Sequence, residues 1–147
     1  MAKIKVTISG LELKNPFILS SGPLTKSTAD ILRAEKSGFG EVIKSATVTP
    51  CEGNPHPRLV FGKGYLVGSE GLPNNGYKAM AQDIQKAKET GVTIPIMASV
   101  AGASPEEYAE MSAEFEKKGA DAVELNLACS HRGSVVGRPK EEPLGRY

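Results

Sequence analysis

Several residue types and patterns are scarce in this chain of 147 residues, and each scarcity excludes a class of protein. Its two cysteines, Cys51 and Cys129, are too few for a disulfide framework, so we expect reduced thiols and a cytoplasmic location. The 18 Lys and Arg nearly balance the 17 Asp and Glu, which leaves no excess charge to attract nucleic acid or an acidic membrane surface. No apolar run reaches the roughly 18–20 residues that span a bilayer, and the N-terminus resembles no signal peptide.

Glycine and proline, by contrast, are plentiful, with 16 and 10 residues respectively. Many of them fall between the predicted helices and strands, and a domain with such elaborate loops usually carries its functional site on them. The hydrophobic fraction of 39% and the charged fraction of 24% are typical of a soluble globular domain. This composition excludes a disordered tail, a collagen and a coiled coil.

The spacing of apolar residues predicts strands that alternate with helices. Residues 3–9 alternate polar and apolar side chains, as a half-buried strand does, and they are expected to form a small hairpin with 11–14. Ser27 and Ser104 have the residue type and context of helix N-caps. The other predicted elements are strands over 17–20, 41–48, 94–100 and 122–126, helices over 28–37, 77–90 and 105–118, and a hairpin over 58–68. This order favours an α/β fold with a parallel sheet and helices outside it.

Small, polar or titratable residues follow the predicted strands at 20–22, 44–45, 99 and 126–129. The carboxyl ends of parallel strands meet at one edge of the sheet, where ligands bind in folds of this class. Lys44 stands in an otherwise apolar strand, where a charge is costly unless it is paired or reaches a ligand. The alternative interpretation is a lysine at the end of the strand whose ammonium extends to water.

Two further side chains at this edge have both a functional and a structural interpretation. Cys129 begins a polar loop and could be a nucleophile or a general acid or base, but most free cysteines are small buried apolar residues. Asn126 ends a strand and needs hydrogen-bond partners, which are either a ligand or the backbone. The segment 71–76 is either a plain turn before a helix or a substrate lid. The few His and Cys residues make no case for a metal site, and no phosphate-loop motif is present.

Six segments of the chain together carry a recognisable pattern. They are Asn15-Pro16-Phe17 running to Ser21-Gly22, Ile43-Lys44-Ser45-Ala46-Thr47, Glu52-Gly53-Asn54-Pro55 with Pro57-Arg58, Gly71-Leu72-Pro73-Asn74, Ser104-Pro105-Glu106-Glu107-Tyr108, and Ala122-Val123-Glu124-Leu125-Asn126-Leu127-Ala128-Cys129. In order and spacing they resemble the flavin-binding barrel of dihydroorotate dehydrogenases, and they are similar to the related barrel of dihydropyrimidine dehydrogenase. The resemblance extends to about Gly133.

The resemblance implies an eight-stranded TIM (β/α)8 barrel that binds FMN and oxidises or reduces a C–C bond of a pyrimidine ring. A whole barrel of this kind typically needs ~250 residues. The chain would therefore be the N-terminal half of a barrel, with about four βα units preceded by a small β-hairpin. Residues 1–133 are expected to form this half-barrel, and 134–147 a polar, poorly ordered tail.

By position, the resemblance also implies roles for individual residues. Lys44 would stabilise negative charge on the reduced flavin, and Cys129 would be the general acid or base. The residues implied to bind FMN are Ser20, Ser21, Gly22, Lys44, Ser45, Ser99 and Asn126. The residues implied to bind the pyrimidine are Ser69, Gly71, Leu72, Asn74 and Asn126. No metal is implied.

Gly68, Ser99 and His131 depart from the residues usual in dihydroorotate dehydrogenases, and the last two look more like dihydropyrimidine dehydrogenase. The substrate is therefore open between an orotate-type acid and a neutral pyrimidine. The electron acceptor is open as well, because family branches use fumarate or a partner subunit with iron–sulfur and FAD centres. The alternative to an enzyme is a non-catalytic half-barrel that self-associates or serves as a scaffold. A homo-oligomer is expected.

Overall fold

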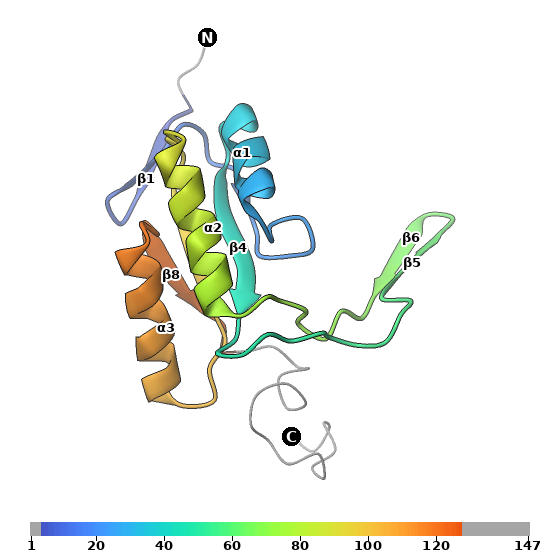
Figure 1. The fold of residues 1–147 in the computed structure, drawn as a ribbon. Helices are drawn as coiled ribbons and strands as arrows, with labels where there is room; N and C mark the ends of the chain where they lie inside the picture. Colours follow the sequence, from blue (N-terminus) through green and yellow to red (C-terminus); the bar gives the residue numbers. More distant parts are fainter. Residues whose placement is uncertain (1–3, 128–147) are drawn as a thin grey trace.

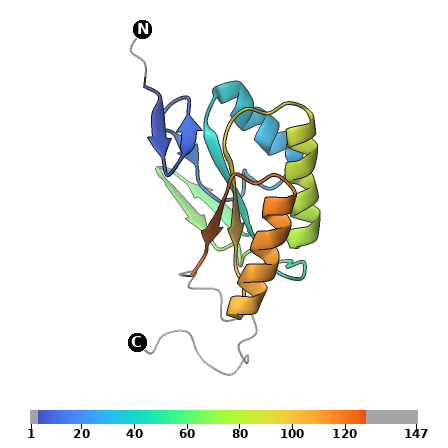
Figure 2. The same ribbon diagram turned by 90° about the vertical axis from the view of Figure 1, so that its left-hand side faces the viewer.

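The computed structural model describes residues 4–127, in which a four-stranded parallel sheet is covered on one face by three helices (Figure 1; Figure 2). The strands, in their order across the sheet, are β3 (Ile18–Leu19), β4 (Gly40–Ala46), β7 (Ile96–Val100) and β8 (Ala122–Leu125). The helices are α1 (Thr28–Ser37), α2 (Tyr77–Glu89) and α3 (Pro105–Lys117). The predicted α/β fold with a parallel sheet and outer helices is confirmed.

Two antiparallel hairpins accompany this sheet. The first pairs β1 (Val6–Ile8) with β2 (Leu11–Leu13), and the second pairs β5 (Leu59–Gly62) with β6 (Tyr65–Gly68). The second hairpin projects from the body of the molecule (Figure 1), and every residue of β6 is exposed. Both hairpins were expected from the sequence, and within residues 4–127 each predicted helix and strand is present with slightly different bounds.

Local signals explain where the helices begin and end. The Ser27 side chain accepts a hydrogen bond from the Asp30 N–H, and the Asp30 carboxylate accepts one from the Ser27 N–H, which completes a capping box. Gly38 ends α1 with a φ of 70°, a conformation that side chains disfavour. Ser104 caps α3 by accepting from the Glu107 N–H. These caps confirm both predicted N-caps.

The core lies between the sheet and the helices. Its buried members from β4 and β7 include Ile43, Ala46, Ile96, Ala98 and Val100, which pack against Ile31, Met80, Ile84, Met111 and Phe115 of the helices. Burying a large apolar side chain contributes roughly 1.5–3 kcal/mol. Because β4 lies between two strands and under the helices, all seven of its residues are buried.

The pairing of β4 with β7 is irregular where the chain approaches the carboxyl edge of the sheet. Residues 41–43 pair in steady register with 96–98, but the register shifts before Ala46 pairs with Val100. The shift lies at Lys44 and Ser45 and interrupts the regular alternation of side chains along the strand. These two consecutive polar residues are thereby placed together at the end of the central strand.

Candidate active site

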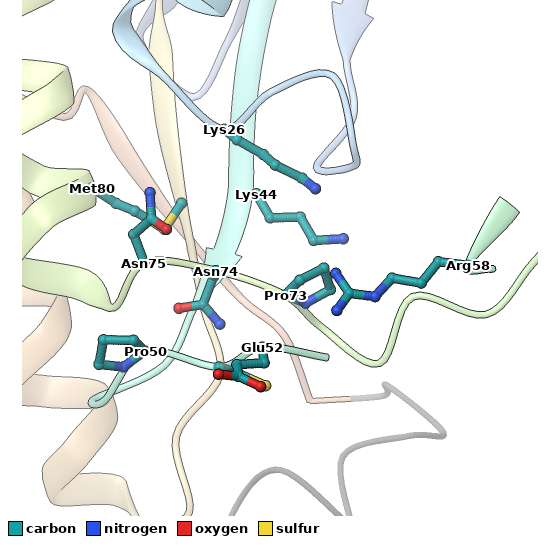
Figure 3. Close-up of a pocket in the computed structure, with 10 residues that line it drawn as sticks. Lys26, Lys44, Pro50, Glu52, Arg58, Pro73, Asn74, Asn75 and Met80 are labelled. Atoms are coloured by element: carbon teal, nitrogen blue, oxygen red, sulfur yellow. The ribbon is translucent and has the colours of Figure 1, made fainter. Parts of the chain in front are cut away.

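A cleft of about 430 Å³ opens beside the carboxyl end of β4 and the long loop that follows it (Figure 3). Figure 3 shows the side chains of Lys26 and Lys44 extending in the same direction from neighbouring segments. The residues that line the cleft are Lys26, Lys44, Pro50, Cys51, Glu52, Arg58, Pro73, Asn74, Asn75 and Met80. The cleft therefore combines three cationic side chains with two amides at the edge of the sheet where ligands were expected.

Lys44 places a cation in a buried position, with 9% of its side chain exposed. Its Nζ lies 2.6 Å from Oε2 of Glu70, on the loop after β6, and Nζ of Lys26 lies 3.7 Å from Oε1 of the same carboxylate. Burial acts to raise the pKa of Glu70, but the hydrogen bond and charge of Lys44, helped by Lys26, outweigh it and leave the pKa below its usual value. The ammonium of Lys44 is thus paired within the chain, and the alternative of a lysine that extends to water is excluded.

The segment after β3 is fastened to β4 at the same point. The Gly22 N–H donates to Oγ1 of Thr25 at 3.0 Å, and the Lys44 N–H donates to the Thr25 carbonyl at 2.7 Å. This attachment brings Lys26, the next residue, to the cleft. Residues 20–22 themselves line a neighbouring cavity of about 500 Å³ against α1. The structure therefore places this predicted FMN segment beside the Lys44 cleft and outside its lining.

Ser45, Ser99 and Asn126 form a hydrogen-bonded row across the carboxyl ends of β4, β7 and β8. The two hydroxyl oxygens are 2.8 Å apart, and Nδ2 of Asn126 donates to Oγ of Ser45 at 3.0 Å. The hydroxyl of Tyr108 on α3 donates to the Asn126 carbonyl at 2.9 Å and so helps to fix the end of β8. The structure brings these three residues together at the end of the strand that carries Lys44, and their shared assignment to FMN stays a prediction.

The loop after β6 has an unusual backbone. Gly71 and Leu72 have φ angles of 69° and 60°, a region that favours glycine and is strained for a branched residue such as leucine. The Asn54 N–H donates to the Glu70 carbonyl at 2.9 Å, and Nδ2 of Asn54 donates to Oγ of Ser69 at 2.9 Å. The segment around Asn54 thus holds in place the loop that carries Glu70 and most of the residues assigned to the pyrimidine.

Asn74 is buried, and its side-chain amide is engaged inside the protein. Its Oδ1 accepts from the Thr47 and Gly76 N–H groups at 3.2 and 2.9 Å. Its Nδ2 donates to the Leu72 carbonyl at 2.9 Å and to Oγ1 of Thr47 at 3.0 Å. Two backbone hydrogen bonds of 2.9 Å join Asn74 to Cys51. In this structure the predicted substrate amide holds its own loop against the end of β4.

Three residues that the sequence patterns did not assign to the site help to hold it together. Glu70 pairs with the ammonium of Lys44, Lys26 pairs with Glu70, and Tyr108 fixes the backbone at Asn126. A charged loop residue is ordinary in a sequence, so the one signal for Glu70 is its place between Ser69 and Gly71. Its pairing with a lysine 26 residues earlier is visible in the structure alone.

Some predicted features lie outside the residues that the structure describes. Cys129 and the predicted tail over 134–147 are among them. Between residues 4 and 127, no group of three or more His, Cys, Asp or Glu side chains could hold a metal ion. In that same part of the chain, no helix has both the length and the apolar character needed to cross a membrane.

The family model described as dihydroorotate dehydrogenase matches residues 3–137. The catalytic subunit of dihydroorotate dehydrogenase B (NAD(+)) from Pyrococcus furiosus is 36% identical over 142 residues, covering 94% of this chain and 46% of that protein. Its counterpart from Methanocella arvoryzae is 38% identical over 130 residues, covering 88% and 42%. A putative dihydroorotate dehydrogenase A (fumarate) from Aeropyrum pernix is 37% identical over 134 residues, with the same coverage of 88% and 42%.

The chain thus spans a little under half the length of these curated relatives. Within that span the family match runs through the hairpin, the parallel sheet and all three helices, and it includes the cleft at Lys44. The pattern of motifs, the geometry of the cleft and the extent of the match agree, and the chain belongs to the dihydroorotate dehydrogenase family.

Proposed function

We propose that this chain is the N-terminal half of a TIM (β/α)8 barrel, with 1–133 as its barrel part, in an FMN-dependent oxidoreductase that acts on pyrimidines. The observation that carries the proposal is the buried Lys44 beside the row of Ser45, Ser99 and Asn126 at the carboxyl edge of the sheet. Ligands bind at this edge in parallel α/β folds. A buried cation next to hydroxyl and amide groups indicates a ligand that carries several acceptors and develops negative charge.

The donor set of this chain fits a flavin. Lys44 would face charge that develops on the ring system, while Ser45, Ser99 and Asn126 would form hydrogen bonds to its polar edge. Residues 20–22 would bind it from the side of β3, through backbone groups and hydroxyls. When bound, FMN supplies the two-electron chemistry, accepting a hydride from a ring carbon or returning it.

The pyrimidine would bind against the loop after β6. Ser69 offers a hydroxyl, and the backbone at Gly71 and Leu72 offers polar groups that are held in an unusual conformation. Asn74 keeps this loop in place and is assigned to the same subsite. Cys129, two residues beyond Leu127, would take the proton from the neighbouring ring carbon while the hydride leaves, and would return it in the reverse direction.

Partners are proposed from the relatives' names and from the resemblance. Several relatives are catalytic subunits of NAD(+)-linked enzymes, which favours a partner subunit that carries iron–sulfur and FAD centres. One relative is described with fumarate instead, and that acceptor is the alternative. Because the relatives are about twice as long, activity is proposed for the site completed by a second half-barrel. A cytoplasmic location stays a prediction.

The test is flavin uptake by the purified protein. After incubation with FMN and removal of free ligand, we expect a bound flavin spectrum, which uracil or orotate should perturb. Lys44→Met should weaken FMN binding by about tenfold, as loss of a buried charge-assisted contact does. The matched control, Lys36→Met, removes an exposed cation from the last turn of α1 and should leave binding unchanged. A colourless protein with no FMN uptake in titration contradicts the proposal for this chain.

A second candidate is the non-catalytic half-barrel that self-associates. It is favoured by the position of β3 and β8 at the two ends of the sheet, with Leu19 37% and Leu125 51% exposed. Unpaired strand edges with apolar side chains tend to associate. A self-associating protein that takes up no FMN would select this candidate over the enzyme.

A further inference from the structure

The carboxylate of Glu70 lies between Lys26 and Lys44, two of the lysines that line the cleft. It contacts Lys44 at 2.6 Å through one oxygen and Lys26 at 3.7 Å through the other, and 17% of its side chain is exposed. No role follows for Glu70 from the residues assigned to flavin or pyrimidine. Its side chain nevertheless reaches the one buried lysine that the proposed reaction needs.

The charged side chains at the cleft differ in how far solvent reaches them. Lys44 and Glu70 form a nearly buried pair of opposite charges, with 9% and 17% of their side chains exposed. The side chain of Lys26 is 37% exposed, so solvent and salt screen its charge more strongly. Glu52 and Arg58 add one charge of each sign to the lining. The buried pair of Lys44 and Glu70 beside the cleft therefore carries no net charge.

We propose that Glu70 makes this cleft select a neutral pyrimidine over a pyrimidine carboxylate, an inference that rests on the proposed function. A carboxylate that approaches Lys44 meets the Glu70 carboxylate on the same ammonium. It must either displace Glu70, which leaves a buried charge without its partner, or bind beside a like charge. Both arrangements weaken the binding of an acid and leave the binding of a neutral ring unaffected.

A neutral pyrimidine such as uracil finds complementary groups at the same place. An ammonium has three N–H donors, and Glu70 uses one of those of Lys44, so a ring carbonyl can accept another. A carboxylate oxygen of Glu70 can accept from a ring N–H. The pair thus presents a donor and an acceptor side by side, which matches the alternating carbonyl and N–H groups of the ring.

The experiment compares uracil with orotate by equilibrium dialysis against the whole chain at pH 7.5, with saturating FMN and without it. We expect the wild type to bind uracil at least tenfold more tightly than orotate. Glu70→Gln, which keeps the size of the side chain, should reduce this ratio at least tenfold, mainly by tightening orotate. A wild type that prefers orotate, or a ratio unchanged in Glu70→Gln, overturns the inference.

Two further variants separate contact from overall charge. Glu52→Gln removes a negative charge from the lining of the same cleft, and neither lysine ion pair involves it. It should change the ratio by less than threefold, and an effect as large as that of Glu70→Gln overturns the inference. Glu70→Asp keeps the charge and should keep the preference for uracil. If Glu70→Gln does not fold, the wild type and Glu70→Asp decide the question.

The same measurements distinguish failure of the proposed flavoenzyme function from failure of the inference about Glu70. Absence of FMN uptake contradicts the flavoenzyme, while the ratio measured without flavin still tests Glu70. Uptake of FMN with no binding of either pyrimidine supports the flavin site and overturns the inference. A protein that binds none of FMN, uracil and orotate overturns both the proposed function and the inference about Glu70.

Discussion

Glu41 is the residue whose burial has the largest chemical consequence in the described part of the chain. Its side chain is 0% exposed, and neither carboxylate oxygen has a hydrogen-bond partner among the described residues. Burial raises the pKa of Glu41 to about 7, repulsion from Asp30 adds to the rise, and attraction to Arg33 opposes it. The carboxyl group of Glu41 therefore stays protonated in the folded core until the pH approaches 7.

This carboxyl predicts a stability that falls as the pH rises. The unfolded chain releases the proton near the usual pKa of 4.5, whereas the folded chain keeps it until about pH 7. The group's contribution is thus fully present below pH 4.5 and is lost by pH 7, a change of about 3 kcal/mol. We expect Glu41→Gln to resemble the wild type near pH 4 and to be about 3 kcal/mol more stable at pH 8 in urea unfolding.

An exposed acid provides the control for that titration. Glu12→Gln alters a carboxylate with 67% of its side chain exposed, on β2, and should shift stability little at either pH. A Glu41→Gln difference that is the same at pH 4 and pH 8 contradicts the assignment of the titration to Glu41.

At the scale of the elements, local sequence signals predict the helices and strands, but they do not predict the contacts that form the site. Ser27 with Asp30, and Gly38 after the last turn, mark the limits of α1 within a dozen residues. The row at the sheet edge instead joins Ser45 to Ser99 and Asn126, partners 54 and 81 residues away. Sequence reasoning placed these residues at strand ends, and the resemblance assigned them a ligand. Their mutual contacts depend on strand register and on the irregularity in β4, which no local pattern encodes.

The capping box of α1 predicts a defined loss of stability. Ser27→Ala removes the side chain that accepts from the Asp30 N–H and should cost about 1 kcal/mol in thermal or urea unfolding. Ser37→Ala, at the other end of the same helix, removes an exposed hydrogen bond to the Arg33 carbonyl that caps no free N–H group, and should cost less. Equal losses at the two ends would contradict a specific role for the cap.

The loop after β6 predicts a difference between two adjacent asparagines. Asn74→Ala leaves the buried Thr47 and Gly76 N–H groups without their side-chain acceptor and should cost roughly 1–3 kcal/mol. Hydrogen exchange at these two amides should accelerate in that variant. Asn75 is exposed, and Asn75→Ala should leave both the stability and the exchange near wild type. Equal effects of the two substitutions would contradict the loop-holding role.

At the scale of the whole molecule, the parallel sheet is open at both ends. The curated relatives are about twice as long, and in the proposed barrel a second half would pair with the edges that this chain leaves open at β3 and β8. The need for a second half was inferred from the number of predicted strands. What covers those edges in an isolated chain depends on contacts between molecules, which a single sequence does not specify.

Exposed edges predict self-association that rises with concentration. Leu125→Lys places a charge on β8, where the leucine is 51% exposed, and should lower the fraction of oligomer in sedimentation velocity. Phe61→Lys makes the same kind of change on the projecting β5–β6 hairpin, at a residue that is 78% exposed. Dissociation caused by Phe61→Lys and not by Leu125→Lys would place the contact on the hairpin and contradict edge pairing.

The projecting hairpin also gives experimental access to the molecule. Its tip, Lys63-Gly64, connects β5 to β6 by two exposed residues, away from the buried core. Exposed loop tips of this kind accept inserted sequences and are cut early by proteases. A short peptide tag inserted after Lys63 should leave the sheet intact, and trypsin should cut there before it cuts the helices. The same position can therefore carry a fluorescent label that leaves the buried core unchanged.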